Sequence, residues 1–587
     1  MRLIRNIMAG LERKYWACTL LSPVAAVGEV LVETIIPYFM ALLIDRGIAG
    51  RDVQYVFRTG GIMVCCALVS MAFGMASARI AAVAALGFAR NLRRRLFGAV
   101  QRFSFANVDR FSTASLVTRL TTDVTNTQNI YQLLIRVFFR APFMLAAGTV
   151  MAFFINGRLA LVFLVAIPVL AAAIVWIASA AYSRYGEMLA KYDRMNRTVQ
   201  ENLIAIRVVK AFVRGGFERE KFNGAADAVR QAQVRAERLV ILLSPIMQLV
   251  IYSSLIAVFW TGGRMVVFGS MKAGELVSFL TYVTQILTSL MMMGMMFVNL
   301  VLSRASVSRI CEVLDEEPDI ASPAAGAARS VRDGSVDFEN VSFSYQKRAD
   351  NCILRNISLH IESGQMVGII GGTGSSKSSL VQLIPRLYDV TAGVVKVGGV
   401  DVRNYALEPL RDSVAVVLQK NVLFSGTIGW NVRWGKKDAS DEEVAAACRA
   451  ADADGFIRSF PKQYGTELGQ GGVNLSGGQK QRLCIARALL KRLKILILDD
   501  STSAVDTATE RRIRDALRAE CPETTKIIIA QRISSVQDAD VIFVLEDGEI
   551  NGAGTHEELL ASNAIYREVY ESQQSMGDAD LPPAQGV

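Results

Sequence analysis

The chain has 587 residues, 52% of them hydrophobic, and a formal net charge of +10. The chain is longer than a typical single domain, and the long apolar blocks in its first half exclude an ordinary soluble protein. Nucleic-acid binding is also excluded, because no recognition motif accompanies the charge and the basic residues crowd the segments between apolar blocks.

Residues 1–15 alternate apolar and basic side chains, which predicts a short amphipathic helix at the cytoplasmic interface of a membrane. Residues 16–315 are predicted to form a transmembrane domain of six helices. A bilayer core requires about 20 apolar residues in a helix. The predicted spans are at about 16–44, 59–78, a third ending with 141–157, 159–183, 239–263 and 276–303.

The connections between these spans alternate in length. Those after the second and fourth spans, 79–140 and 184–238, are long, basic and helical in pattern. Basic loops are enriched on the cytoplasmic side, so both termini are predicted to be cytoplasmic. The two long connections predict helices that project well beyond the bilayer.

Two acidic residues fall at membrane depth in the first span. Glu29 and Glu33 are four residues apart and therefore share one helix face. Acids within a membrane usually face a cavity or a partner. Two interpretations remain open: a site for cationic cargo or a proton-linked gate, and a structural pair facing the aqueous lumen. Arg136 and Arg140 are predicted to extend toward the cytoplasmic membrane edge.

Residues 316–334 contain proline, alanine and glycine and are interpreted as a linker. A soluble domain is predicted at 335–575 and a disordered tail at 576–587. The alternating strand that begins this domain leads to Tyr345, which is placed to stack on a base.

The buried-type strand 366–370 precedes a glycine-rich turn and a helix, an order typical of phosphate-binding loops. In such loops a lysine reaches the terminal phosphates and the next hydroxyl holds Mg²⁺, here Lys377 and Ser378. Ser376 departs from the pattern, because a glycine is expected there. The candidate nucleotide-binding residues of the turn are Thr373, Gly374, Ser375, Ser376, Lys377, Ser378 and Ser379.

Five further motifs follow along the chain. Gln419 ends a strand, and Asp499 ends a buried strand as a carboxylate suited to Mg²⁺. Asp506 follows closely, and Gln531 comes directly after another apolar strand. The segment between Gln419 and Asp499 contains a helix-opening run of Leu475, Ser476, Gly477, Gly478 and Gln479.

The order of these motifs resembles an ABC transporter half-subunit over nearly the whole chain. The resemblance implies an all-α transmembrane domain of six helices fused to an α/β P-loop nucleotide-binding domain, with ATP and Mg²⁺ as cofactors. Residues 111–123 and 201–212 resemble coupling regions that transmit motion to the ATPase domains, one of them to the partner's. Tyr345 would stack on adenine and Gln419 would link Mg²⁺ to coupling. The signature residues that would contact ATP held by the opposite subunit are Ser476, Gly477, Gly478 and Gln479.

Two catalytic positions depart from the family pattern. Active members carry Glu after the Asp of the last buried strand, where this chain has Asp500, and a switch His where it has Gln531. The Asp carboxylate is withdrawn by roughly one ångström, a misplacement that can cost on the order of 10²-fold in rate. A glutamine can donate a hydrogen bond but cannot carry a proton. This chain's own site is therefore predicted to hydrolyse ATP poorly.

These features favour one half of a heterodimeric exporter in a bacterial inner membrane. The predicted partner is a second half-transporter that carries Glu and His at these positions and uses the intact signature of this chain. The predicted cargo is an amphipathic small molecule, drug-like or lipid-like, and membrane lipid is a further predicted partner. The alternatives are an ATP-gated regulatory or channel-like subunit, or a transporter of peptides, lipids or siderophores, with import not excluded.

Overall fold

The computed structural model describes residues 7–323, 326–346, 348–372, 374–491, 493–500 and 505–579. It divides into two compact units. The first comprises Met1–Gln101 and Phe111–Glu316, and the second comprises Arg102–Arg110 and Glu317–Val587. Residues 317–334 of the predicted linker therefore group with the second unit, as does the short segment Arg102–Arg110, which lies directly before the first predicted coupling region.

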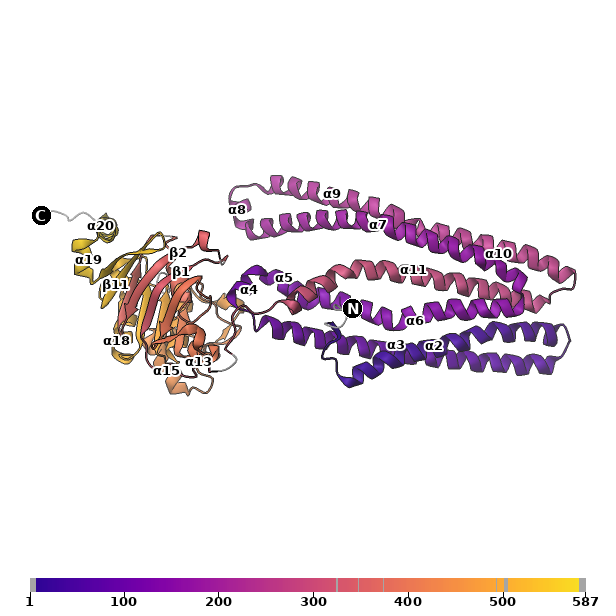
Figure 1. Cartoon of the computed structure of the whole chain (residues 1–587), viewed down its shortest axis with the longest axis horizontal. Helices are drawn as coiled ribbons and strands as arrows, with labels where there is room; N and C mark the ends of the chain where they lie inside the picture. Colours follow the sequence, from indigo (N-terminus) through magenta and orange to yellow (C-terminus); the bar gives the residue numbers. More distant parts are fainter. Residues whose placement is uncertain are drawn as a thin grey trace. The chain divides into compact units, whose positions relative to one another are not determined.

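The first unit is a bundle of long helices that lie side by side (Figure 1). Six of its helical runs are long and apolar enough to cross a membrane, which confirms the predicted fold class for this half. Two π-helical turns, η1 (Leu43–Ile48) and η2 (Arg119–Asp123), interrupt these runs. The α-helices are α2 (Arg13–Leu42), α3 (Val53–Val100), α5 (Thr113–Thr118), α6 (Val124–Ile155), α7 (Gly157–Ile204), α8 (Ile206–Ala211), α9 (Gly215–Ile241), α10 (Leu243–Val267) and α11 (Ala273–Asp315).

Local sequence explains where helix α7 begins and how α11 is held. The Asn156 side chain caps α7 by accepting hydrogen bonds from the backbone N–H groups of residues 158 and 159. Phe279 of α11 stacks on Phe163 of α7 with 5.7 Å between ring centroids. Tyr282 of α11 is fully buried and donates to the carbonyl of Thr34 on α2 at 2.7 Å. Helix α11 thus packs against both α2 and α7.

The second unit contains two main sheets, which confirms the predicted α/β domain. Its strands are β1 (Val336–Phe343), β2 (Leu354–Ile361), β3 (Met366–Ile370), β4 (Ala392–Val397), β5 (Val400–Asp401), β6 (Val414–Val417), β7 (Gly426–Thr427), β8 (Glu467–Leu468), β9 (Ile495–Asp499), β10 (Thr525–Ile529), β11 (Val541–Glu546) and β12 (Glu549–Gly554). An antiparallel sheet has the order β2-β1-β4-β5, and a six-stranded sheet has the order β12-β11-β3-β10-β9-β6. In the larger sheet only β12 runs antiparallel to its neighbour.

The parallel strands β3, β10 and β9 are buried at every position. Burial at every position is typical of strands covered on both faces. Because the carboxyl ends of parallel strands meet at one edge, the segments that follow these strands are brought together there. The residues after β3, β9 and β10 are the phosphate loop, Asp500 and Gln531.

The helices of the second unit are shorter than those of the first. The segment Arg102–Arg110, which precedes the first predicted coupling region, contains α4 (Phe105–Arg110). The others are α12 (Lys377–Gln382), α13 (Leu407–Ser413), α14 (Ile428–Val432), α15 (Asp441–Ala450), α16 (Asp454–Ser459), α17 (Gly477–Leu489), α18 (Thr507–Glu520), α19 (His556–Ser562) and α20 (Ala564–Ala579), with the 3₁₀ turns η3 (Ala349–Asn351), η4 (Val402–Asn404), η5 (Gln463–Gly465), η6 (Gln470–Gly472) and η7 (Ile533–Ser535).

Some predicted segments differ from the structure or lie outside it. Helix α20 continues to Ala579, so 576–579 is helical where a disordered tail was predicted. Residues 580–587 of that tail lie outside the described residues, as do residues 1–6 of the predicted interfacial helix.

Candidate functional site: a phosphate loop facing two aspartates

The phosphate loop connects the buried strand β3 to helix α12. Lys377 begins the helix, and its ammonium donates to the carbonyl oxygens of Gly371 and Gly372, both at 2.8 Å, and to Ser375 Oγ at 3.1 Å. Burial lowers the pKa of Lys377, and the nearby carboxylates Asp500 and Asp499 oppose this shift. The lysine therefore lies folded over the loop and close to the ends of β9. Thr373, a predicted member of the loop, lies outside the described residues.

Ser376 adopts a left-handed conformation, with φ 67° and ψ 23°, directly before α12. An L-residue with a side chain costs roughly 1–2 kcal/mol there, whereas glycine adopts it without strain. The departure from the sequence pattern at Ser376 is thus located at the one loop position among the described residues where a side chain meets positive φ.

A hydroxyl and a carboxylate suited to Mg²⁺ lie in direct contact. Ser378 Oγ donates to Asp499 Oδ1 at 2.8 Å, and Asp499 is only 3% exposed. Burial raises the pKa of Asp499, and the Ser378 hydrogen bond and Lys377 oppose the rise. Hard oxygen donors of this kind fit Mg²⁺, which proteins usually bind through one or two carboxylates together with substrate phosphates. The described residues contain no cluster of three or more His, Cys, Asp or Glu able to hold a metal.

Two glutamine side chains converge on Asp500. Asp500 Oδ2 accepts hydrogen bonds from Gln531 Nε2 at 2.9 Å and from Gln419 Nε2 at 3.3 Å. Burial raises the pKa of Asp500, and both amide hydrogen bonds oppose the rise. The sequence motifs around Gln419, Asp500 and Gln531, far apart in the chain, are therefore parts of one site.

Tyr345, the predicted base-stacking residue, is 49% exposed, and its side chain is held by one hydrogen bond and two aromatic contacts. Its hydroxyl shares a 2.8 Å hydrogen bond with Ser379 Oγ of α12. Its ring meets the rings of Phe343 and Tyr388 edge-on, at 5.0 and 5.1 Å between centroids. A flat aromatic face held in this way suits stacking on a nucleotide base.

Tyr388 was not identified from the sequence, because no motif marks it. It is 8% exposed and donates to Asp109 Oδ2 of α4 at 2.6 Å, while Phe105 of the same helix meets its ring edge-on. Burial and the Asp109 contact raise the pKa of Tyr388. One tyrosine thus contacts both α4 and Tyr345, the predicted base-stacking residue.

The signature residues begin helix α17 and do not join this cluster through any hydrogen bond that the described part of the chain makes. Ser476 Oγ accepts from the backbone N–H of Gln479 at 3.3 Å, and the Gln479 side chain accepts from the backbone N–H of Ser476 at 2.9 Å. This reciprocal capping leaves Gly477 and Gly478 in the exposed first turn. The exposed end of a capped helix is suited to an anion supplied from elsewhere.

Asp506 caps helix α18 rather than contacting the phosphate loop. Its Oδ1 accepts from the backbone N–H of Thr509 at 2.9 Å, and this hydrogen bond lowers the pKa of Asp506. Residues 501–504, which precede it, lie outside the described residues.

In the first unit, the acidic pair on α2 has a basic partner on α6. Arg140 Nη2 lies 2.9 Å from Glu33 Oε2 and 3.3 Å from Glu29 Oε1. The three side chains are 18%, 31% and 12% exposed, in that order. The expectation that Arg140 extends to the membrane edge is therefore wrong, because two carboxylates hold it inside the bundle. Glu29 Oε2 is buried and has no hydrogen-bond partner among the described residues.

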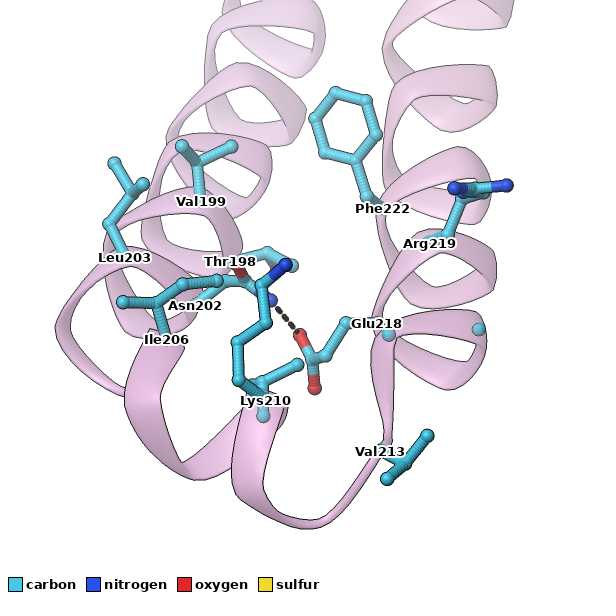
Figure 2. A pocket seen from close by; sticks show the side chains of 13 residues that line it. Thr198, Val199, Asn202, Leu203, Ile206, Lys210, Val213, Glu218, Arg219 and Phe222 are labelled. Atoms are coloured by element: carbon cyan, nitrogen blue, oxygen red, sulfur yellow. Dashed lines mark hydrogen bonds between the residues drawn. The ribbon is translucent and has the colours of Figure 1, made fainter.

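The second predicted coupling region forms a groove of about 700 Å³ at the turn between α7 and α9. Figure 2 shows its side chains, with Asn202 of α7 donating to Glu218 of α9 at 3.0 Å. Several apolar side chains at this turn are largely exposed, among them Val213 at 87% and Phe212 at 74%. Exposed apolar surface of this kind commonly marks a protein contact.

Comparisons with known proteins agree with this organisation. Residues 19–290 match the family described as the ABC transporter transmembrane region, and residues 354–503 match the family described as ABC transporter. An uncharacterized ABC transporter ATP-binding protein of Bacillus subtilis (strain 168), YfiB, is 38% identical over 93% of this chain and 94% of its own length.

Two further matches extend the comparison. The ATP-dependent lipid A-core flippase of Desulfotalea psychrophila is 32% identical over 82% of this chain and 84% of its own length. A solved bacterial Atm1-family ABC exporter with ATP bound superposes with a TM-score of 0.84 at 25% identity, over 98% of this chain and all of that chain.

Proposed function

Since this chain belongs to the ABC transporter family, as a half-size exporter with one membrane domain and one ATP-binding domain, we propose that it works as one half of a heterodimer. In that heterodimer its own ATP site binds nucleotide but hydrolyses it poorly. Its signature helix completes the active site of the partner, and ATP turnover there drives export of amphipathic small molecules, drug-like or lipid-like.

The observation that carries this proposal is the pairing of Asp500 with Gln531. The Asp500 carboxylate is one methylene shorter than the glutamate expected there, and its Oδ2 already accepts two amide hydrogen bonds. An amide is no substitute for a histidine that can carry charge, since it neither gains nor loses a proton near neutral pH. Both groups that would prepare water for attack are therefore weakened together, while Lys377 and Ser378 retain the chemistry for binding ATP and Mg²⁺.

The intact signature supports the second part of the proposal. Ser476 and Gln479 cap α17 reciprocally, so its first turn is preformed for a phosphate group. In this chain an intact signature occurs together with a weak catalytic pair, Asp500 and Gln531. Such a signature can support ATP hydrolysis only when it contacts ATP bound at a competent phosphate loop of another chain. The expected partner therefore carries Glu and His where this chain has Asp500 and Gln531.

The exposed apolar turn around α8 supports a paired assembly. We assign its contact to the nucleotide-binding domain of the partner, because Phe212 and Val213 would otherwise remain in water. On this chain's own nucleotide-binding domain, Phe424 stacks on Trp434 at 4.2 Å between centroids, and both line a cavity of about 360 Å³. This aromatic cavity is the corresponding receptor for the partner's turn.

The basic segments between spans support an orientation with both termini in the cytoplasm. In a bacterium the matching location is the inner membrane. The direction of transport and the class of cargo rest on the exporter fold and on the flippase relative. Glu29 and Glu33 remain candidate lumen residues, although their contact with Arg140 favours the structural interpretation.

The test is reconstitution of this chain in lipid vesicles, alone and with the half-transporter encoded beside it. Alone, the chain is expected to show little Mg²⁺-dependent ATPase. With the partner, Asp500→Ala should change total ATPase little, whereas replacing the partner's catalytic glutamate should abolish it. Brisk turnover by the chain alone, or near-complete loss on Asp500→Ala, would overturn the proposal.

The alternative of an ATP-gated channel-like subunit is separated by the same vesicles. A transporter accumulates a dye against its gradient only while ATP is hydrolysed. A gated channel passes solute down its gradient with non-hydrolysable nucleotide alone, and that result would replace the export proposal.

A further inference from the structure

A glutamine on the last described helix makes two hydrogen bonds to the backbone at Gln531 and Ile533. Gln573, on helix α20, accepts a hydrogen bond from the backbone N–H of Ile533 at 2.9 Å. Its amide nitrogen donates to the carbonyl oxygen of Gln531, also at 2.9 Å. One primary amide thus satisfies a donor and an acceptor that lie two residues apart in the chain.

The segment held by Gln573 lies outside the sheet, where the neighbouring backbone hydrogen bonds are those of the turn η7. Strand β10 ends at Ile529, and the backbone N–H of Ala530 makes the last hydrogen bond to β3, at 3.3 Å to the carbonyl of Ile369. Beyond that point the chain leaves the sheet. A side-chain amide offers the same donor and acceptor pair as a peptide group, so Gln573 acts where a neighbouring strand would.

The helix that carries Gln573 is itself firmly attached. Tyr566, at the beginning of α20, is fully buried, and its hydroxyl shares a 2.8 Å hydrogen bond with His556 Nδ1 of α19. The backbone N–H of Tyr566 also donates to Asn563 Oδ1 at 2.9 Å. Because this helix is fixed in place, a side chain on it that makes hydrogen bonds also fixes the backbone segment to which it bonds.

The gripped residue contacts the catalytic carboxylate. The Gln531 side chain donates to Asp500 Oδ2 at 2.9 Å, so hydrogen bonds connect Gln573 through Gln531 to Asp500. All three line a cavity of about 380 Å³, together with Arg532. The C-terminal helix therefore forms one wall of the cavity that Asp500 also lines.

We propose that Gln573 is a positioning residue that holds Gln531 where its amide meets the terminal phosphate of ATP bound to this subunit. This rests on the proposed function, in which the site binds ATP. Gln573 does not touch the nucleotide, and it acts only through Gln531. The C-terminal helix thereby determines how well this site distinguishes a nucleoside triphosphate from a diphosphate.

The test compares two nucleotides on the full-length chain in lipid nanodiscs with Mg²⁺. The non-hydrolysable triphosphate AMP-PNP carries the terminal phosphate, and ADP lacks it. Gln573→Ala is expected to weaken AMP-PNP binding by roughly three- to tenfold, the range for one or two lost hydrogen bonds, and to leave ADP binding unchanged. Unchanged ADP binding also shows that the variant is folded.

The neighbouring glutamine provides a matched control. Gln574 is exposed and donates at 2.7 Å to the hydroxyl of Tyr570 within its own helix. Gln574→Ala removes the same side chain one position further along, and it is expected to change neither affinity. An equal loss of AMP-PNP affinity in Gln574→Ala would overturn the proposal, because the effect would then belong to the helix and not to the contact.

A double-mutant cycle tests whether Gln573 acts through Gln531. Gln531→Ala alone is expected to lose the preference for AMP-PNP, and Gln573→Ala in that background is expected to change it no further. Additive losses, or parallel weakening of AMP-PNP and ADP by Gln573→Ala, would overturn the positioning role. These affinities are measured without hydrolysis, so brisk ATPase by the chain alone would contradict the heterodimer and leave this inference standing.

Discussion

Ser376 and Asp500 share a backbone conformation that side chains rarely adopt. Their φ angles are 67° and 49°, in the left-handed region. Aspartate is among the residues that tolerate this region, whereas serine does so less readily. The two departures from the family pattern therefore differ in kind: Asp500 alters the chemistry of the site, and Ser376 mainly strains its loop.

Replacing Ser376 with glycine should relieve that strain. We expect Ser376→Gly to stabilise the nucleotide-binding unit by about 1 kcal/mol, because glycine adopts left-handed φ without a steric cost. Thermal unfolding of the purified full-length chain measures the change. Ser376→Val is the opposite control and should lower the unfolding temperature, since a β-branched side chain fits this region poorly. A lower unfolding temperature for Ser376→Gly would contradict the assignment.

We expect Asp499 to make Mg²⁺ binding sensitive to pH. Because burial raises its pKa, the carboxyl takes up a proton at a higher pH than an ordinary aspartate, whose pKa is about 3.9. The protonated form binds Mg²⁺ poorly, so the gain in ATP affinity from Mg²⁺ should shrink on acidification from about pH 7, and the decline should begin at a higher pH than for an ordinary aspartate. Titration of nucleotide binding with and without Mg²⁺ measures this gain.

Asp499→Asn should remove both the Mg²⁺ gain and its pH dependence. A gain that stays constant down to about pH 4.5 would show that Asp499 has an ordinary or lowered pKa.

At the scale of elements, Arg140, Glu29 and Glu33 form an ion triad that connects helices α2 and α6. Arg140 compensates two carboxylates that are both largely enclosed. Removing one partner of a buried ion pair usually costs about 3–5 kcal/mol, because the remaining charge stays in a medium that solvates it poorly. The triad is therefore a sensitive point of the membrane domain.

We expect Arg140→Met to lower the thermal stability of the chain in nanodiscs strongly. The combination Arg140→Met, Glu29→Gln, Glu33→Gln should recover most of the loss, since it leaves no unpaired charge. A triple variant as unstable as Arg140→Met would show that Arg140 acts through packing and not through its charge. Equal stability of Arg140→Met and wild type would show that the carboxylates have enough water to remain ionised alone.

The sequence predicted most elements because their signals are local. Apolar length revealed the spans, and β3, β9 and β10 were visible as apolar runs followed by motif residues. Contacts between distant segments had no such signal. Arg140 was assigned to the membrane edge because its carboxylate partners are more than a hundred residues away in the chain. Gln573 and Tyr388 belong to no motif, and only the tertiary structure brings them to the nucleotide site.

At the scale of the whole molecule, the apolar turn around α8 is expected to matter for the proposed heterodimer and not for the stability of the single chain. Phe212 is 74% exposed, so it contributes little to the stability of the isolated chain. In the proposed heterodimer the same side chain is buried against the partner. A substitution there should therefore affect the pair and not the single chain.

We expect Phe212→Asp to leave the unfolding temperature of the isolated chain nearly unchanged. In vesicles with the partner, it should abolish the stimulation of ATPase by transported compounds, because a charge would be forced into the contact. Val234→Asp is the matched control, since Val234 is also an exposed apolar residue, on α9 away from the groove. Normal stimulation in Phe212→Asp would place the partner contact elsewhere.

The division of the molecule does not follow the division of the sequence, because α4 belongs to the second unit although the membrane half of the chain encodes it. Phe105 and Asp109 cover Tyr388, and Asn107 donates to the backbone carbonyl of Glu317 at 3.2 Å. A protease that cuts after Glu316 would thus release a domain missing part of its own surface. Tyr388 would be left with a solvent-exposed hydroxyl beside the ring of Tyr345. Recombining such a domain with the spans of another transporter would require transplanting α4 with it.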